Sequence, residues 1–240
     1  KRDYVRFFKA GGDITGARRL YLLAAANRVV ASASEDPDPA SLSPRSVVVF
    51  RNEIEANDQR FFHFVQGHHE SIRRKLLQIT KPPFRPAAPG GPFISVHVRF
   101  GDFAPPASES ELTRGMTNRR LPIEWYLEML SAIARVRDKP SIVVYSDGSD
   151  EELAPILAFP GVTRSRSRVA VTDLLNMAQS QLMISSGSGL SRFGAFLGQV
   201  PRICYPGQKI VSVLDDPAME VECSTASQAD SFLRQFLEVA

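Results

Sequence analysis

Cysteine is scarce in this sequence: Cys204 and Cys223 are the only two among 240 residues. Neither belongs to a CxxC pair, and no cysteine–histidine spacing matches a structural zinc site, which excludes the zinc-finger and zinc-ribbon classes. We expect two ordinary thiols, with a disulfide between them as the alternative.

Long apolar runs are absent as well. No stretch of about 18 apolar residues occurs, so the sequence predicts no membrane-spanning helix. The longest candidate, residues 18–33, is interrupted by Arg28 and leads into an acidic, proline-rich segment. The sequence begins at Lys1 without a methionine or a signal-peptide pattern, and we therefore expect a chain trimmed at its start.

Lysine is rare among the basic residues: 6 of the 29 are lysine and 23 are arginine. Arginine forks suit phosphate and carboxylate groups, although coding bias is the simpler explanation of the overall excess. The formal net charge is only +3, and the run TRSRSRV at 163–169 has no interleaved aromatic residues. We therefore expect no nucleic-acid partner, and a solvated edge or loop at 163–169.

Apolar periodicity divides the sequence into two parts. The first part has three expected elements: a helix over 14–31, a short buried strand over 46–50 and a partial helix within 61–79. A proline- and glycine-rich stretch at 81–92 then predicts a domain boundary or linker. We expect a partial N-terminal region over 1–88 and a Rossmann-like domain over 89–240.

After this linker, strands and helices alternate, which predicts a mostly parallel sheet with helices on both faces. The expected strands are 93–98, 141–147, 181–186 and 202–206, and the expected helices are 123–136, 149–157, 171–180, 189–198 and 225–239. Ser149 and Glu152 form a capping-box pattern, and 101–121 is expected to be a long loop. The fold class is α/β, with a Rossmann-like parallel sheet in the C-terminal half and a smaller, partial N-terminal α/β region.

Polar side chains follow three of these strands at their carboxyl ends, where parallel α/β sheets bind ligands. These clusters are His97, Arg99 and Asp102 in SVHVRFGDF (95–103), Ser146 and Asp147 after the next strand, and Ser185 to Ser191 in SSGSGLSRFG. A strand, a Gly/Ser turn and a helix start aim backbone N–H groups at one point, which predicts an anion site. The alternative is a plain tight turn in which a serine caps the helix.

Arg99 would hold a diphosphate from the side opposite this turn, with Asp102 orienting it; a structural ion pair is the alternative. His97 is a base, a hydrogen-bond donor or a buried structural residue. Arg192 stands where a dinucleotide fingerprint has its third glycine, so that motif is excluded.

The histidines of HFVQGHHE and Glu70 are residue types that can bind a metal ion. His63, His68 and His69 lack the i,i+4 pairing of helical zinc sites. We expect a solvated helix face and no metal site.

Several segments resemble, in order and spacing, motifs of the α-1,2-fucosyltransferases. SVHVRFGDF resembles their H-x-R-x-G-D motif, and LPIEWYLEML (121–130) resembles the helix that follows this motif. VVYSDGSDEEL (143–153) resembles their F-S-D-D strand end. Residues 173–198 resemble their D-x-x-L-M-S helix together with the strand, turn and helix that come after it. The resemblance covers roughly residues 46–205. The wider superfamily includes α-1,6- and protein O-fucosyltransferases, some of which carry an arginine at the position of Arg192.

This resemblance implies a GT-B fold with two Rossmann-like halves, of which the carboxyl half binds GDP-fucose without a metal. It implies that the region 1–88 is the acceptor side and that the domain 89–240 binds the nucleotide sugar. Fucose is then transferred to a glycan hydroxyl with inversion. Arg99 would bind the β-phosphate and stabilise the leaving GDP, His97 would line the donor site, and Asp173 would fix the guanine and ribose end. The other implied donor-site residues are Asp102, Asp147, Ser186, Ser188, Ser191 and Arg192.

Three departures from the family pattern keep alternatives open. Gly148 replaces the second aspartate of S-D-D, Arg192 and Phe193 replace paired tryptophans, and AGGDITGARR (10–19) is a poor match to the G-G-x-G-N-Q turn. The alternatives are a catalytically inactive relative that binds a nucleotide or glycan, and an unrelated Rossmann-like nucleotide-binding protein. Glu109, Glu111 and His97 are the candidate general bases. Family members lie in the Golgi lumen in animals and in the cytosol in bacteria, so no compartment is predicted.

Overall fold

The computed structural model describes most of the chain. The described residues are 4–9, 16–31, 39–50, 62, 65–87, 90–167 and 169–238. None of the helices formed by these residues combines the length and apolar character needed to cross a lipid bilayer.

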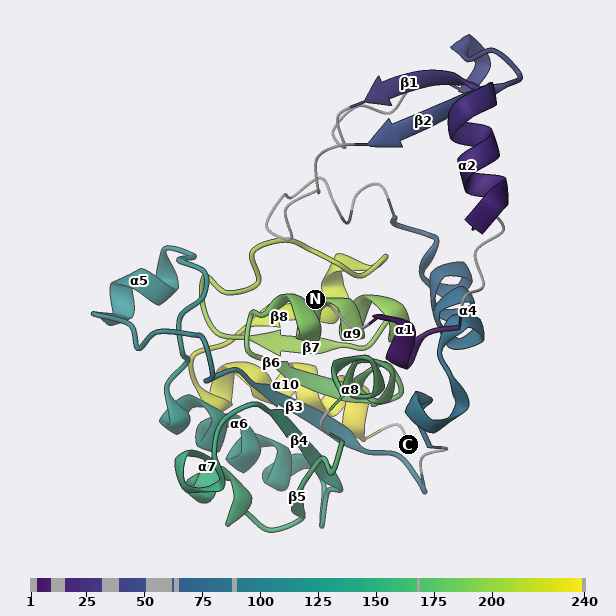
Figure 1. Cartoon of the computed structure of the whole chain (residues 1–240). Helices are drawn as coiled ribbons and strands as arrows, with labels where there is room; N and C mark the ends of the chain where they lie inside the picture. The colour runs from purple at the N-terminus through teal and green to yellow at the C-terminus, as the bar shows by residue number, and fades with distance from the viewer. Residues whose placement is uncertain are drawn as a thin grey trace.

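Six parallel strands form the central sheet, in the order β5-β4-β3-β6-β7-β8 (Figure 1). They are β3 (Ile94–Val98), β4 (Ile142–Ser146), β5 (Val162–Arg164), β6 (Leu182–Ser185), β7 (Arg202–Cys204) and β8 (Glu220–Glu222). The predicted α/β class with a parallel sheet is confirmed. The sequence analysis missed β5 and β8, because strands of three residues are too short to show an apolar pattern.

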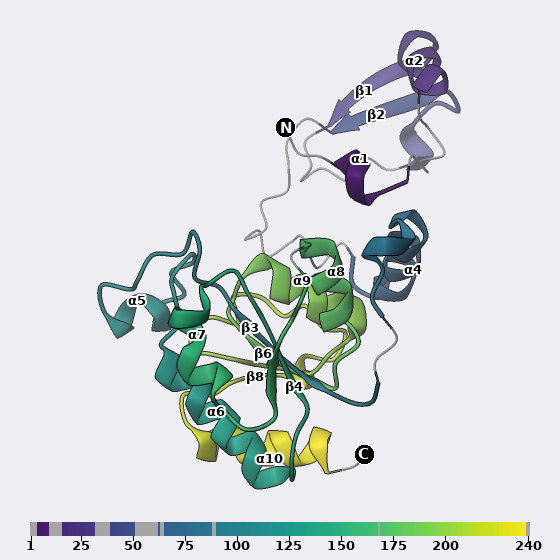
Figure 2. The same cartoon turned by 60° about the horizontal axis from the view of Figure 1, so that its bottom comes forward.

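Helices cover both faces of this sheet (Figure 2). The helices of this part of the chain are α4 (His69–Ile79), α5 (Glu109–Thr113), α6 (Ile123–Val136), α7 (Asp150–Leu157), α8 (Ala170–Met177), α9 (Gly189–Gly198) and α10 (Ala226–Leu237), with short 3-10 turns η2 (Pro82–Phe84) and η3 (Pro217–Met219). The 3-10 turn η1 (Pro39–Ser41) lies in the N-terminal region. Helices α6 and α10 pack together on one face, and α8 and α9 pack together on the other, where α4 rests against α9.

Alternation along β3 decides which face each side chain of the motif strand occupies. Ile94, Val96 and Val98 belong to the apolar cluster under α6 and α10. Ser95 and His97 point to the other face: Ser95 bonds Ser180 just after α8, and His97 bonds the turn before α9. A strand has a side-chain period of two, so the alternation places His97 on the α8/α9 side.

Helix α2 (Gly16–Ala25) and strands β1 (Asn27–Ala31) and β2 (Ser46–Phe50) form a small unit in the N-terminal region. Helix α1 (Tyr4–Phe7) instead lies beside the end of α4, where Lys9 N–H donates to Ile79 O (2.6 Å) and Lys81 N–H donates to Phe7 O (2.9 Å). Strands β1 and β2 pair in parallel as a two-stranded sheet that lies apart from the large one (Figure 1). The predicted helix over 14–31 is therefore wrong beyond Ala25. The β-branched Val29 and Val30 favour a strand and pair with Val48 and Val49. The boundary between 1–88 and 89–240 stays a prediction, and residues 88 and 89 lie outside the described part.

Two local expectations have clear outcomes. The capping box is confirmed: Glu152 N–H donates to Ser149 Oγ (3.2 Å), and Ser149 N–H donates to Glu152 Oε2 (2.9 Å). The loop expected over 101–121 contains the short helix α5.

Cys204 and Cys223 are both buried free thiols.

Candidate ligand-binding site

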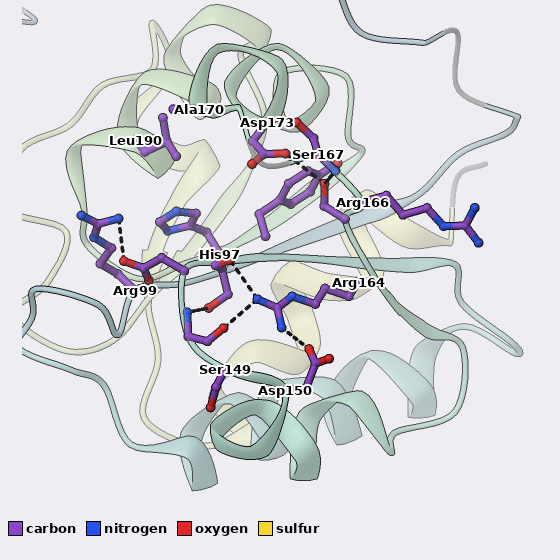
Figure 3. A pocket seen from close by; sticks show the side chains of 15 residues that line it. His97, Arg99, Ser149, Asp150, Arg164, Arg166, Ser167, Ala170, Asp173 and Leu190 are labelled. Carbon is purple, nitrogen blue, oxygen red and sulfur yellow. Dashed lines mark hydrogen bonds and ion pairs between the residues drawn. The ribbon is translucent and has the colours of Figure 1, made fainter. Parts of the chain in front are cut away.

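A cavity of about 820 Å³ lies at the carboxyl ends of β3, β4 and β5 (Figure 3). His97 and Arg99 come from the tip of β3, and Asp147 follows β4. Ala170 and Leu190 line it from the amino ends of α8 and α9. A volume of this size accommodates a small-molecule ligand, and the place in the sheet is where α/β folds bind one.

Arg99 is held by two carboxylates. Its Nε and Nη2 bond Asp102 Oδ1 (3.0 and 2.8 Å), and its Nη1 bonds Asp147 Oδ2 (2.7 Å). The Nε contact is a hydrogen bond and the two Nη contacts are ion-pair contacts. Of the five N–H donors of a guanidinium, at least two are therefore engaged by no described residue. The side chain is 33% exposed, so an anion can reach these two donors from the cavity.

Asp147 anchors the backbone as well as Arg99. Phe100 N–H donates to its Oδ1 (2.9 Å). Burial opposes ionisation of this carboxyl, but hydrogen bonds from the Phe100 and Gly101 backbone and the charge of Arg99 outweigh burial and lower its pKa. A Cβ on Gly101 would lie 2.3 Å from Asp147 Oδ2. The glycine of the H-x-R-x-G-D segment is therefore needed because the Asp147 carboxylate occupies the place of its side chain.

His97 is 3% exposed and stands between the cavity and the Gly/Ser turn. Its Nδ1 lies 2.6 Å from Ser186 Oγ and 3.5 Å from Ser188 Oγ. Burial, reinforced by Arg99, lowers the pKa of His97 to about 4. The imidazole is therefore neutral at pH 7.

The opposite wall carries Asp173, in the first turns of α8. Ser165 donates its hydroxyl hydrogen to Asp173 Oδ1 (2.9 Å). Burial raises the Asp173 pKa to about 6, although hydrogen bonds from Ser165 and Ser167 act in the other direction. Figure 3 shows Arg99 on one side of His97, and Ser167 and Asp173 on the other. The cavity thus has a guanidinium at one end and a carboxylate acceptor at the other.

The arginine run 163–169 begins in β5, which is an edge strand of the sheet, and Arg166 is exposed, in agreement with the expected solvated edge. The run also contributes to the cavity, which the sequence analysis did not predict. Arg164 and Arg166 line the cavity after β5. Arg164 pairs with Asp150, and its Nη2 donates to the carbonyls of Gly148 (2.6 Å) and Ser146 (3.3 Å). It therefore ties the end of β5 to the β4–α7 turn. The signal that identifies this segment is its place after a strand, and that strand was missed.

Ser191 and Arg192 lie away from the cavity, within the packing of α9. Ser191 is fully buried, donates to Ser188 O (3.0 Å) and bonds Ser185 Oγ (3.0 Å). Arg192 is 2% exposed, and burial together with the charge of Arg202 lowers its pKa.

The structure thus brings Arg99, Asp147, His97 and Asp173 together, with Asp102 at the rim on Arg99. It places Ser186 and Ser188 behind the imidazole.

Two candidate bases lie elsewhere. Glu111 accepts hydrogen bonds from Arg119 Nε (2.9 Å) and Ala107 N–H (3.1 Å). Glu109 bonds Tyr205 Oη (2.9 Å) and lines a different cavity beside α5. Neither glutamate lines the cavity at Arg99.

At the start of α4, His68 and Glu70 are exposed, as expected for a solvated face, whereas His69 is not. His69 is half-buried, pairs with Asp215 (3.1 Å) and packs edge-on against Phe196. His63 lies outside the described residues. The described part of the chain holds no group of three or more histidine, cysteine or acidic residues arranged for a metal ion.

Comparison with solved structures gives partial likenesses, whereas comparison with family models and curated proteins gives none. No protein-family model and no curated protein matches the chain. POFUT1 in complex with GDP (crystal form III) matches with a TM-score of 0.34 and 17% identity over 57% of this chain and 46% of that chain. POFUT1 in complex with GDP-fucose (crystal form I) matches with a TM-score of 0.29 and 19% identity, over 57% of this chain and 45% of that chain. The high-resolution structure of POFUT1 in complex with GDP matches with a TM-score of 0.31 and 17% identity, over 82% of this chain and 62% of that chain.

The chain therefore spans less than two thirds of the length of these solved structures. A likeness of this size, at this identity, does not assign a family, a substrate or an activity.

Proposed function

We propose that this protein is a glycosyltransferase that binds a GDP-sugar, with GDP-fucose as the donor, in the cavity at the carboxyl ends of β3, β4 and β5. One observation carries the proposal. Arg99, at the tip of the strand that resembles the H-x-R-x-G-D motif, is held by two carboxylates and keeps two N–H donors for an anion. A bidentate guanidinium is the preferred partner of a diphosphate.

Arg99 would act on the leaving group. When the bond between the sugar and the β-phosphate breaks, negative charge develops on the departing GDP. A cation fixed in advance at that oxygen stabilises the transition state more than the ground state. Asp102 and Asp147 fix the guanidinium before the ligand arrives, so little reorganisation is needed during the reaction. The acceptor oxygen forms its bond to the anomeric carbon as the bond from that carbon to GDP breaks, and the hydroxyl proton passes to a phosphate oxygen of the departing GDP or to water. Inversion follows if this attack comes from the face of the sugar opposite to GDP.

Asp173 would recognise the nucleoside end of the donor. A carboxylate is a hydrogen-bond acceptor only, whereas the guanine N1–H and exocyclic amine and the ribose hydroxyls are donors. Ser165 and Ser167 hold the carboxyl in place. The spacing of a guanidinium and a carboxylate at opposite ends of one cavity suits an extended nucleotide with phosphate at one end and hydrogen-bond donors at the other.

The acceptor would be a glycan hydroxyl, held by residues outside this cavity. In the GT-B arrangement that the sequence resembles, a second Rossmann-like half faces the donor domain. A second candidate function is that the protein binds the GDP-sugar and does not transfer it. Gly148, which stands in place of the second aspartate of the family's S-D-D pattern, favours this alternative.

A turnover assay separates the two candidates. GDP-fucose labelled in the sugar is incubated with the full chain and a panel of glycan acceptors, and the release of GDP and the labelled product are measured. Transfer that is lost in Arg99→Ala and kept in Arg135→Ala supports the enzyme; Arg135 pairs with Asp230 away from the cavity. Tight GDP-fucose binding without GDP release on any acceptor supports the binding protein. Absence of binding contradicts both.

A further inference from the structure

His97 has an unusual environment for a residue that lines a cavity. Its ring is buried on the side of Nδ1, where the hydroxyls of Ser186 (2.6 Å) and Ser188 (3.5 Å) both face the same nitrogen. Both serines are themselves buried, at 2% and 7% exposure. Which nitrogen of a neutral histidine carries the proton is set by the bond that the other nitrogen makes. The donors and acceptors available to the two serine hydroxyls therefore determine which ring nitrogen of His97 carries the proton.

Each serine hydroxyl has one hydrogen to donate and lone pairs to accept. Ser186 Oγ receives the N–H of Ser188 (3.4 Å), and among the described residues its hydrogen has one acceptor in reach, His97 Nδ1. The Ser188 hydroxyl has the same single acceptor within the described part of the chain. If Nδ1 carried a proton, the buried Ser186 hydroxyl, which lies at 2.6 Å, would lose its acceptor, and so would the Ser188 hydroxyl at 3.5 Å when it takes its turn at the single lone pair of Nδ1. Nδ1 is therefore the acceptor.

We propose that Ser186 and Ser188 hold His97 as the neutral tautomer with its hydrogen on Nε2, so that His97 donates a hydrogen bond to the bound ligand and is not the general base. This inference rests on the proposed function for the identity of the ligand, whose acceptor atom is a phosphate, ribose or sugar oxygen or a base nitrogen. Ser186 and Ser188 are then positioning residues, which act through His97.

Nε2 is placed to make that contact. It is not among the fully buried polar atoms that lack a partner, and no described residue hydrogen-bonds it. The ring lines the cavity between Arg99 and Asp173 (Figure 3). Nε2 lies on the ring edge away from Nδ1 and is open to the ligand. The lowered pKa, about 4, agrees with a ring that stays neutral when the ligand binds.

The turn that presents the two serines is fixed from behind. Gly187 stands between them with φ +73°, a conformation that favours glycine. A Cβ there would meet Gln208 Oε1 at 3.1 Å and the Gln208 carbonyl oxygen at 3.2 Å. Gln208 is in turn held by its Nε2, which donates to Leu112 O (2.7 Å) and Met116 O (3.2 Å). The serine pair is therefore preorganised around the imidazole before a ligand enters.

Nitrogen NMR of the full chain tests the tautomer without any ligand. Long-range 15N–1H imidazole spectra at pH 7 distinguish a protonated from an unprotonated ring nitrogen, and His97→Gln identifies the His97 signals among the four histidines. We expect an unprotonated Nδ1 and a protonated Nε2. Ser186→Ala should move His97 toward a mixture of tautomers, and Ser186→Thr, which keeps the hydroxyl, should restore the single form. A proton on Nδ1, or on both nitrogens, overturns the proposal.

Two matched variants test the donor role. The amide nitrogen of glutamine can take the place of Nε2, whereas that of asparagine overlays Nδ1. We expect His97→Gln to bind GDP-fucose within about threefold of the wild type and His97→Asn to bind at least tenfold more weakly. In turnover, the loss of kcat in His97→Gln should stay well below the about 10²–10⁴-fold that loss of a general base costs. A loss of that size in His97→Gln with unchanged binding contradicts the proposal. A protein that shows the expected tautomer but binds no GDP-sugar refutes the proposed function and leaves the tautomer standing.

Discussion

Gly101→Ala should weaken both the fold and the site, because the new methyl group takes the place of the Asp147 carboxylate. The Cβ would lie 2.3 Å from Asp147 Oδ2 and 3.0 Å from Cγ, whereas ordinary contacts begin at 3.4 Å. The carboxylate must therefore move by about 1 Å, and its bonds to Arg99 Nη1 (2.7 Å) and Phe100 N–H (2.9 Å) cannot both survive.

The magnitude follows from those two bonds. The ion pair is partly exposed at both ends, at 33% and 30%, and such pairs contribute about 0–1 kcal/mol. A backbone N–H bond to a charged group contributes about 1.5–3 kcal/mol. Because part of each bond can re-form after the shift, we expect the free energy of unfolding to fall by about 1–3 kcal/mol, or the Tm by about 3–10 °C. GDP affinity should fall by about tenfold, because Arg99 keeps only Asp102.

Chemical denaturation and calorimetric titration with GDP measure the two effects. Gly90→Ala is the matched control, since no atom lies within 4 Å of the place of its Cβ; its stability should stay within about 0.5 kcal/mol of the wild type. A Gly101→Ala variant that equals the wild type in stability and in GDP affinity would refute the idea that Asp147 holds Arg99 in place.

The remaining predictions concern other parts of the site and one helix. Arg164→Lys should weaken GDP binding about three- to tenfold, because an ammonium cannot reach Asp150 and the Gly148 carbonyl together. Calorimetric titration with GDP measures this loss, and the control variant Arg135→Lys should show no change in GDP affinity. Asp173 has a raised folded pKa of about 6, so GDP-fucose affinity should drop between pH 7.5 and 5 in the wild type and stay flat in Asp173→Asn. GDP-fucose is the probe because its diphosphate does not titrate near pH 6. The stability that Asp173 contributes below its unfolded pKa is lost as the pH rises through about 6, so denaturation should find Asp173→Asn more stable than the wild type at pH 7.5 and not at pH 3.5. Glu152→Ala should cost about 1 kcal/mol of stability through the broken capping box, and an unchanged unfolding midpoint would contradict this.

Much of the fold could be predicted from the sequence because its signals are local. The alternation of apolar strands with helices sets the parallel sheet, and the Ser149–Glu152 spacing sets a helix start. The limit of local signals is visible at Ala25, where an apolar stretch changes from helix to strand. Val29 forms a strand because β2, about 20 residues later, pairs with it, and pairing partners are not visible in a local pattern.

The site was predictable where it depends on strand ends and unpredictable where it depends on contacts between them. His97, Arg99 and Asp147 follow strands, and the rule for parallel sheets brings them to one edge. That Asp147 holds Arg99, and that Ser186 faces an imidazole, depends on side-chain directions. Arg164 was missed because it ends β5, a strand of three residues whose sequence shows no apolar pattern.

Calorimetric titration with GDP, UDP, ADP and NAD, without added metal, tests the central claim that Arg99 belongs to a GDP-sugar site. The account predicts that the wild type prefers GDP by at least about tenfold and that Arg99→Ala loses at least about tenfold in GDP affinity while its unfolding midpoint stays near that of the wild type. No binding of any nucleotide, or GDP binding that is unaffected by Arg99→Ala in a folded protein, would contradict it.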